Sequence, residues 1–511
     1  MYTLLISMAA LILGYLLYGR FVERIFKPDP KAATPAYSRQ DGVDFIPMPE
    51  WKIFMIQFLN IAGTGPIFGA IMGAMFGPAC YLWIVLGCIF GGAVHDYLSG
   101  MISIRMGGEG LPGIVGANLG SVVRKVMLFF CVLMLLLVGA VFVYSPAEIL
   151  GEMTSDPAAW AAAKSAGTVP TAALIWVGVV LAYYLLATLV PVDKIIGKIY
   201  PIFAIALIFM AVALFVHLIS TFPAMPEIWD GLGNRNPSGG SIFPVLFITI
   251  ACGAVSAFHA TQSPLMARCL RNEKYGRPVF YGAMITEGLI ALVWATVSIW
   301  FFYGGGYSQL GFPPDFMVDG VKMVPSAPAI VSKVSRSWLG AFGSVLALLG
   351  VVAAPITSGD TALRSARLII ADALKLDQQP LMKRLAVSVP VFAVTGLLLW
   401  FELANYNGFM VVWQYFGWGN QTLAVFTLWA LTSFLSRHRA APAYLITLIP
   451  ACFMTAVCVT FISTAKIGFG LPASAIPYLG YGSFIISLIL FFLLRNKRLK
   501  NEQQSIPSSR V

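Results

Sequence analysis

The sequence predicts an all-α polytopic membrane protein, and three observations lead to that fold class. Of its 511 residues, 59% are hydrophobic and only 11% are charged, far less charge than a soluble chain of this length carries. Charge-free windows at Val126–Ala147, Ile199–Pro226 and Ile467–Leu494 each exceed the roughly 20 residues that cross a bilayer. Two clusters of helix-breaking residues interrupt apolar stretches, at Asn60–Pro66 and Ala251–Pro264.

The two interruptions carry functional information because broken backbone is costly in hydrocarbon. An N–H or C=O group without a partner there loses several kcal/mol. Such a break survives where it is buried in protein or coordinates a ligand. A matched pair of discontinuous helices is typical of the central site of a secondary transporter.

Hydropathy and the placement of Gly and Pro predict about thirteen transmembrane helices. They lie near residues 2–22, 53–76, 79–103, 122–145, 170–191, 200–220, 242–265, 278–303, 337–363, 384–401, 408–435, 441–463 and 475–494. The first stretch lacks the basic region and cleavage motif of a signal peptide, so we expect it to be retained as a span.

Basic residues set the predicted orientation. If the tail Arg495–Lys500 is cytoplasmic, every second loop towards the N-terminus is cytoplasmic too, and those loops carry most of the Lys and Arg. The N-terminus is then periplasmic and the C-terminus cytoplasmic. The net charge of +11 follows from this distribution, so we expect the bilayer and not nucleic acid as the macromolecular partner.

The interrupted spans are the second and the seventh, which predicts a 5+5 inverted repeat. Because five spans form each unit, the second unit enters the membrane from the opposite side. We expect an extra helix and cytoplasmic loop at 1–49, repeats at 50–220 and 221–437, two C-terminal helices at 438–494 and a basic cytoplasmic tail at 495–511. The alternative is that Gly and Pro are simply frequent in membrane helices.

The ninth span ends in a polar face. Thr357, Asp360, Thr361 and Arg364 are spaced so that they share one side of a helix. Hydroxyl and carboxylate oxygens in that arrangement suit a hard cation or a protonatable site. The alternative is a structural pair between Asp360 and Arg364 at a cytoplasmic helix end.

Other ionisable groups within spans are candidates because they are expensive there. His95 and Asp96 invite a proton-relay interpretation, but an interfacial histidine beside a capping aspartate near Arg105 is the favoured one. Glu287 lies within the eighth span. His259 lies within the second interruption, where it would donate to a carboxylate substrate or serve a structural role.

The amides Asn420 and Gln421 would either donate to a substrate or brace helices, and bracing is the commoner outcome. Seven cysteines without CxxC spacing and four histidines without HExxH spacing predict no metal site. The absence of a Walker A pattern disfavours ATP-driven pumping. No nucleophile–base pair is evident, so we expect no enzyme and no cofactor.

Several of these motifs occur together in an order that resembles the carbon starvation protein (CstA) family of bacterial inner-membrane transporters. The resemblance is carried by Ile61–Pro66, Gly91–Asp96 with Ser103 and Arg105, Ala251–His259, Tyr281–Met284 with Glu287, Thr357 with Asp360, Arg364 and Arg367, and Asn420 with Gln421. It implies uptake of pyruvate or short peptides during carbon starvation. It also implies an APC-type, leucine-transporter-like fold, in which a hydroxyl pair on the eighth core helix, here Thr357 and Ser358, helps to bind sodium.

The sequence and the resemblance together predict a symporter coupled to Na⁺ or H⁺ that works by alternating access. The expected substrate-binding residues are Ala62, Gly63, Thr64, Gly65, Cys252, Gly253, Ser256, His259, Asn420 and Gln421. The expected ion-coupling residues are Thr357, Ser358, Asp360 and Thr361, and the expected proton relay or gate comprises His95, Asp96, Glu287 and Arg364. The alternative function is a nutrient sensor or scaffold of the same fold without net transport.

Overall fold

The chain folds as a bundle of helices. The computed structural model describes residues 1–63, 65–165, 168–189, 196–237, 240–312, 317–318, 321–322, 325, 327–378, 380–404, 408–439 and 441–504. Within these residues the only strands form one short hairpin, in which β1 (Met317–Val318) pairs antiparallel with β2 (Val321–Lys322). The all-α fold class predicted from composition is therefore confirmed.

The helices of the first half, including short π-helical or 3-10 turns marked η, follow the predicted apolar stretches. They are α1 (Tyr2–Leu13), η1 (Gly14–Tyr18), α2 (Gly19–Phe26), α3 (Pro35–Ser38), α4 (Glu50–Ile61), η2 (Gly65–Gly69), α5 (Ala70–Ala74), α6 (Ala79–Leu86), η3 (Gly87–Gly92), α7 (Ala93–Arg105), α8 (Leu111–Leu119), α9 (Ser121–Thr154), α10 (Pro157–Ser165), α11 (Thr171–Leu189) and α12 (Ile196–Thr221).

The second half begins with short turns and then forms longer helices. They are η4 (Ile228–Asp230), η5 (Ile242–Leu246), α13 (Phe247–Thr249), α14 (Ala257–Ala267), η6 (Glu273–Tyr275), η7 (Arg277–Tyr281), α15 (Gly282–Tyr303), α16 (Gly306–Gln309), α17 (Ala327–Leu374), α18 (Leu381–Ala404), α19 (Gly408–His438), α20 (Leu445–Thr464), η8 (Ala473–Ala475) and α21 (Ile476–Gln504).

Within the described residues, nine helices are long and apolar enough to cross a membrane, and the bent pair α4 and α5 adds a tenth. The other three predicted spans correspond to the shorter helix α11, to the second interrupted segment and to α19. The count of thirteen spans, the orientation of the termini and the repeat boundaries therefore stay predictions.

Both interruptions predicted from the sequence are present. Helix α4 ends at Ile61, and the segment from Gly65 to Ala74 continues at an angle of 53°. Helix α13 ends at Thr249 and α14 begins at Ala257, so residues 250–256 between them are not helical. The two discontinuous helices are thus confirmed.

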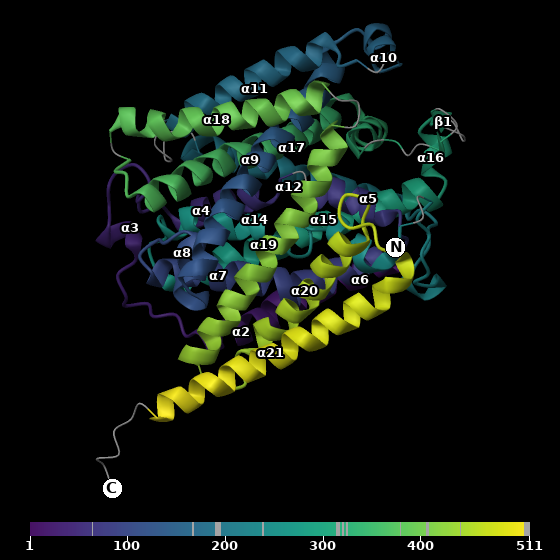
Figure 1. Ribbon diagram of the computed structural model, residues 1–511. Coiled ribbons are helices and arrows are strands. Elements are labelled where there is room, and N and C mark those ends of the chain that lie inside the picture. The colour runs from purple at the N-terminus through teal and green to yellow at the C-terminus, as the bar shows by residue number, and fades with distance from the viewer. Residues whose placement is uncertain are drawn as a thin grey trace.

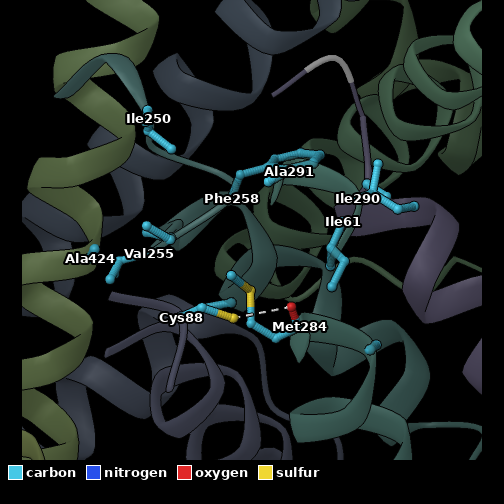
Figure 2. Packing of buried hydrophobic residues seen from close by; sticks show 14 of the residues in the cluster. Ile61, Cys88, Ile250, Val255, Phe258, Met284, Ile290, Ala291 and Ala424 are labelled. Carbon is cyan, nitrogen blue, oxygen red and sulfur yellow. Dashed lines mark hydrogen bonds between the residues drawn. The ribbon is translucent and has the colours of Figure 1, made fainter. Parts of the chain in front are cut away.

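The interrupted helices lie in the middle of the bundle. Helices α11 and α18 cover one side of it, α20 and α21 cover the opposite side, and α14 and α15 lie between (Figure 1). Figure 2 shows buried side chains of this central region, where the thiol of Cys88 in η3 donates to the carbonyl oxygen of Met284 in α15 at 3.4 Å. The core therefore consists of contacts between the two halves of the chain.

Helix α17 differs from its prediction in length. The ninth span was expected to end near residue 363, but the helix continues to Leu374, with a break in helical geometry at Gly340. Arg364 and Arg367 lie inside the bundle, each only 1% exposed. The helix continues through them because another segment supplies a buried carboxylate, described below.

Candidate functional site

The two interruptions touch one another. A Cβ atom on Gly65 would lie 2.3 Å from both Cβ and Sγ of Cys252. A Cβ atom on Gly69 would lie 2.9 Å from the carbonyl oxygen of Thr249. Glycine is therefore required for this approach of the two backbones, since any side chain at Gly65 would push the interruptions apart.

Side chains from neighbouring helices satisfy the backbone of the second interruption. The indole of Trp83 donates to the carbonyl of Ile250 at 2.9 Å, and Gln421 Nε2 donates to the carbonyl of Val255 at 2.8 Å. Asn420 Oδ1 accepts from the backbone N–H of Phe258 at 2.7 Å. These bonds offset the cost of burying non-helical backbone inside the bundle.

Asn420 and Gln421 therefore brace the interruption, which is the commoner of the two roles expected for them. Asn420 also contacts Ser256, with its Nδ2 at 3.0 Å and its Oδ1 at 3.2 Å from the hydroxyl oxygen. Cys252 Sγ lies 3.5 Å from the same hydroxyl. Of the other residues expected to bind substrate, Ala62 is buried, Gly253 lies against Ala291, and Thr64 falls outside the described residues.

Ser358 connects α17 to the end of the first interrupted helix. Its hydroxyl donates to the carbonyl oxygens of Asn60 at 2.9 Å and Leu59 at 3.2 Å. The hydroxyls of Thr357 and Thr361 instead donate to carbonyls of their own helix. Among the predicted ion-coupling hydroxyls, Ser358 is thus the one that reaches the interruption.

Asp360 is fully buried and is bonded to a residue that the sequence did not single out. Its Oδ2 accepts from the hydroxyl of Tyr200 at 2.7 Å, while its Oδ1 has no hydrogen-bond partner among the described residues. The structural pair between Asp360 and Arg364 is not among the ion pairs of the described residues. Asp44, from the segment before α4, lies 3.8 Å from a nitrogen of Arg364 and 3.8 Å from one of Arg367.

A second polar cluster brings together residues of α7, α14 and α15. Asp96 accepts from two imidazoles, with Oδ1 2.8 Å from His95 Nδ1 and Oδ2 2.9 Å from His259 Nδ1. His259 Nε2 lies 3.5 Å from Glu287 Oε2. All four side chains are fully buried. We call these four residues the His–Asp–His–Glu chain.

This geometry overturns the favoured interpretation of His95 and Asp96 as an interfacial pair near Arg105. Both residues lie in the interior, because α7 continues for nine residues beyond Asp96 to Arg105. Arg105 in turn forms an ion pair with Glu273 at 3.1 Å. The structure therefore separates Arg105 from the pair and joins the pair to His259.

The contact between His259 and Glu287 requires one proton. An ionised Asp96 only accepts hydrogen bonds, so both imidazoles donate to it from Nδ1. In neutral His259 the Nε2 atom then carries a lone pair, which would repel an ionised Glu287. The contact is favourable when one proton lies on either partner, as a carboxylic acid on Glu287 or as an imidazolium on His259.

Three residues near these contacts were not among the site residues predicted from the sequence. Asn60 is fully buried beside the first interruption, and neither polar atom of its amide has a hydrogen-bond partner among the described residues. An amide directly before a helix break was a signal that could have found it. No local sequence pattern marks Tyr200 or Asp44, since Tyr200 contacts Asp360 and Asp44 contacts Arg364, both far away in the sequence.

A comparison with protein families matches residues 1–179, 161–335 and 326–462 to the family described as carbon starvation protein CstA. An uncharacterized membrane protein of Haemophilus influenzae is 48% identical over 329 residues, which are 57% of this chain and 89% of that protein. The pyruvate/proton symporter BtsT of Escherichia coli is 28% identical over 366 residues, 60% of this chain and 50% of that protein. The peptide transporter CstA of Bacillus subtilis is 27% identical over 506 residues, 82% of each chain.

Solved structures are similar in fold. A mutant of the manganese transporter of Eremococcus coleocola matches with a TM-score of 0.52 and 12% identity, over 90% of this chain and 99% of that one. A second mutant of the same transporter matches with a TM-score of 0.53. At this identity the likeness concerns the fold alone, and it agrees with the all-helical architecture described above.

Proposed function

The chain belongs to the carbon starvation protein CstA family, and from this premise we propose that it imports small carboxylate nutrients by alternating access, coupled to a proton. The proposed substrate class is pyruvate or short peptides; of the relatives, BtsT is named a pyruvate/proton symporter and CstA a peptide transporter. The place of action is the inner membrane of a bacterium.

The proposed substrate site lies where the two interruptions meet. The N–H groups of Ala62 and Gly63 already donate to the carbonyls of Phe58 and Ile61, so the proposed anion site lies on the side of the second interruption, directly after which α14 begins at Ala257. The amino-terminal end of a helix attracts an anion through its free N–H groups and its dipole. His259, in the first turn of α14, contacts Asp96 through Nδ1 and Glu287 through Nε2, so it would act on the substrate carboxylate through its charge.

The observation that carries the proposal is the His–Asp–His–Glu chain. In this proposal, the proton that Glu287 and His259 would share lies next to the turn of α14 that would face the substrate, because His259 is the third residue of α14 and its Nε2 is 3.5 Å from Glu287. A carboxylate arriving at that turn is an anion, so its binding would stabilise an imidazolium at His259. Substrate and proton would then bind together and leave together, which is the requirement for symport.

The bond from Ser358 to the first interruption is the proposed link to movement. Because Ser358 joins α17 to the end of α4, rocking of one helix group against the other would break or form it. Asp360, two residues further along α17, would change its charge during the cycle. Sodium remains the alternative coupling ion, bound by Ser358 and the carbonyl oxygens of Leu59 and Asn60.

The test is transport by the purified full chain in proteoliposomes. Labelled pyruvate and labelled dipeptides are each offered in counterflow, and then under a pH gradient or a sodium gradient alone. We expect counterflow with one of the two substrates and concentrative uptake under the pH gradient. Binding without flux under every gradient would instead identify a sensor and refute the proposal.

A further inference from the structure

Asn60 carries a buried amide without a partner at the end of the first interrupted helix. It is the residue before Ile61, the last of α4, and its side chain is fully buried. Neither its Nδ2 nor its Oδ1 has a hydrogen-bond partner among the described residues. The great majority of buried polar side chains in native proteins are paired, because an unpaired one has lost its hydrogen bonds to water without replacement. The partner of this amide is therefore to be sought outside the chain.

The fold offers such an amide a partner within its own helix, and Asn60 does not use it. In α8, the Nδ2 of the buried Asn118 donates to the carbonyl oxygen of Ile114, one turn earlier, at 2.9 Å. The side chain of Asn60 forms no such bond within the described part of the chain. Its backbone carbonyl, by contrast, is occupied, since it accepts from the Ser358 hydroxyl at 2.9 Å. The side chain thus keeps its donors and its acceptor for another molecule.

The side chain of Asn60 lies on the side of α4 that faces α14. Gln57, three residues earlier, shares this side of the helix, and its Nε2 is 3.3 Å from the hydroxyl oxygen of Ser263 in α14. Beyond the end of α4, a Cβ atom on Gly65 would lie 2.3 Å from Cys252. Because these two contacts follow the same order along both segments, Asn60 lies opposite the stretch between Cys252 and Ser263. That stretch includes the first turn of α14, where the substrate carboxylate is proposed to bind.

Resting on the transport function proposed above, we propose that the side chain of Asn60 binds the polar group beside the substrate carboxylate and so selects substrates that carry one. A side-chain amide both donates and accepts hydrogen bonds. Its Nδ2 would donate to the keto oxygen of pyruvate, or its Oδ1 would accept from the peptide N–H next to the terminal carboxylate of a dipeptide. With the carboxylate held at the start of α14, this bond fixes the substrate at a second point. A carboxylate without such a group leaves the amide unpaired and is rejected.

The first experiment measures selectivity by competition in proteoliposomes that hold the purified full chain. Counterflow of labelled pyruvate is inhibited with pyruvate or with propionate, which lacks the keto oxygen. Counterflow of labelled dialanine is inhibited with dialanine or with alanyl-lactate, in which an ester oxygen replaces the peptide N–H. For the substrate that the wild type exchanges, we expect the analogue to bind about tenfold more weakly, which corresponds to roughly one hydrogen bond. In Asn60→Leu the substrate loses this bond, so the ratio should fall to about onefold.

The second experiment measures the melting temperature without substrate. Leucine has the branched shape of asparagine but no polar atoms, so Asn60→Leu removes an unpaired polar group and should raise the melting temperature. Asn118→Leu is the matched control, because it breaks the bond to Ile114. It should lower the melting temperature and leave the competition ratios as in wild type. An amide of Asn60 that is paired through a buried water would instead make Asn60→Leu less stable.

The outcomes separate this inference from the transport function. A lower melting temperature in Asn60→Leu, or a competition ratio in that variant equal to the wild-type ratio, would overturn the role of Asn60 and leave the transport function intact. Equal binding of substrate and analogue by the wild type would do the same. If the wild type exchanges neither pyruvate nor dialanine, the transport function itself is refuted, and the role of Asn60 falls with it.

Discussion

Replacing Glu287 with glutamine should separate substrate exchange from proton-driven accumulation. Glu287 has no hydrogen-bond partner among the described residues, and its contact to His259 at 3.5 Å needs one proton. The glutamine amide can donate to His259 Nε2 permanently, but it releases no proton. Glu287→Gln therefore imitates the proton-loaded form.

The expected magnitude follows from one exchangeable proton per substrate molecule. Entry of a monovalent carboxylate with one proton is electroneutral, so only the pH gradient drives it. One pH unit is worth about 1.4 kcal/mol, which corresponds to roughly tenfold accumulation. In Glu287→Gln we expect accumulation to fall to about onefold while counterflow continues.

The assay measures labelled substrate in proteoliposomes with a gradient of one pH unit and no sodium. Glu402→Gln is the matched control, because Glu402 is a buried carboxylate in α18, outside the His–Asp–His–Glu chain. It should accumulate substrate as wild type does. If Glu287→Gln also accumulates about tenfold, the assignment of the proton to this contact is wrong.

Three other substitutions test separate parts of the structure. Asp360→Asn should abolish accumulation while the protein folds normally, as measured by uptake and by size-exclusion chromatography; full coupled uptake would remove Asp360 from the mechanism. Gly65→Ala should destabilise the protein by about 1–3 kcal/mol, because the new methyl group overlaps Cys252. Adding Cys252→Gly should recover part of the lost melting temperature, and additive losses would contradict the contact. Burial alone would raise the pKa of Glu227, but hydrogen bonds from the N-terminal amine and from the backbone lower that pKa below its usual value. The ionised carboxylate of Glu227 thus stabilises the fold fully when the pH is above the pKa that Glu227 has in the unfolded chain. This stabilisation is lost as the pH falls through the lower pKa that Glu227 has in the folded protein. Glu227→Gln should therefore melt earlier than wild type at pH 7, with a difference that shrinks below about pH 4.

The interruptions could be predicted because their signal is local. Gly, Pro and hydroxyl residues crowded into an apolar stretch around Gly65 or Cys252 indicate a break wherever the helix lies in space. The signal for spans such as α9 and α20 is equally local, since an uncharged apolar run of sufficient length is enough to identify them. The fold class followed from the same information.

The partners of the candidate residues could not be predicted. Asp96 and His259 are 163 positions apart, and Ser358 and Asn60 are 298 apart. Nothing in one sequence says which distant polar groups meet, and Tyr200 looks like any aromatic residue in an apolar helix. The sequence analysis favoured a position at the membrane–water interface for His95, because the hydropathy pattern indicates only a polar pair, His95 and Asp96, near the end of a span.

The central claim is that each substrate molecule enters with one proton, and the most direct test measures both fluxes in the same vesicles. Labelled pyruvate or dipeptide uptake is followed together with internal pH, reported by an enclosed dye, in the absence of sodium. The account predicts that the vesicle interior acidifies by one proton for each substrate molecule taken up. Substrate entry without acidification, or entry only when sodium is present, would contradict it.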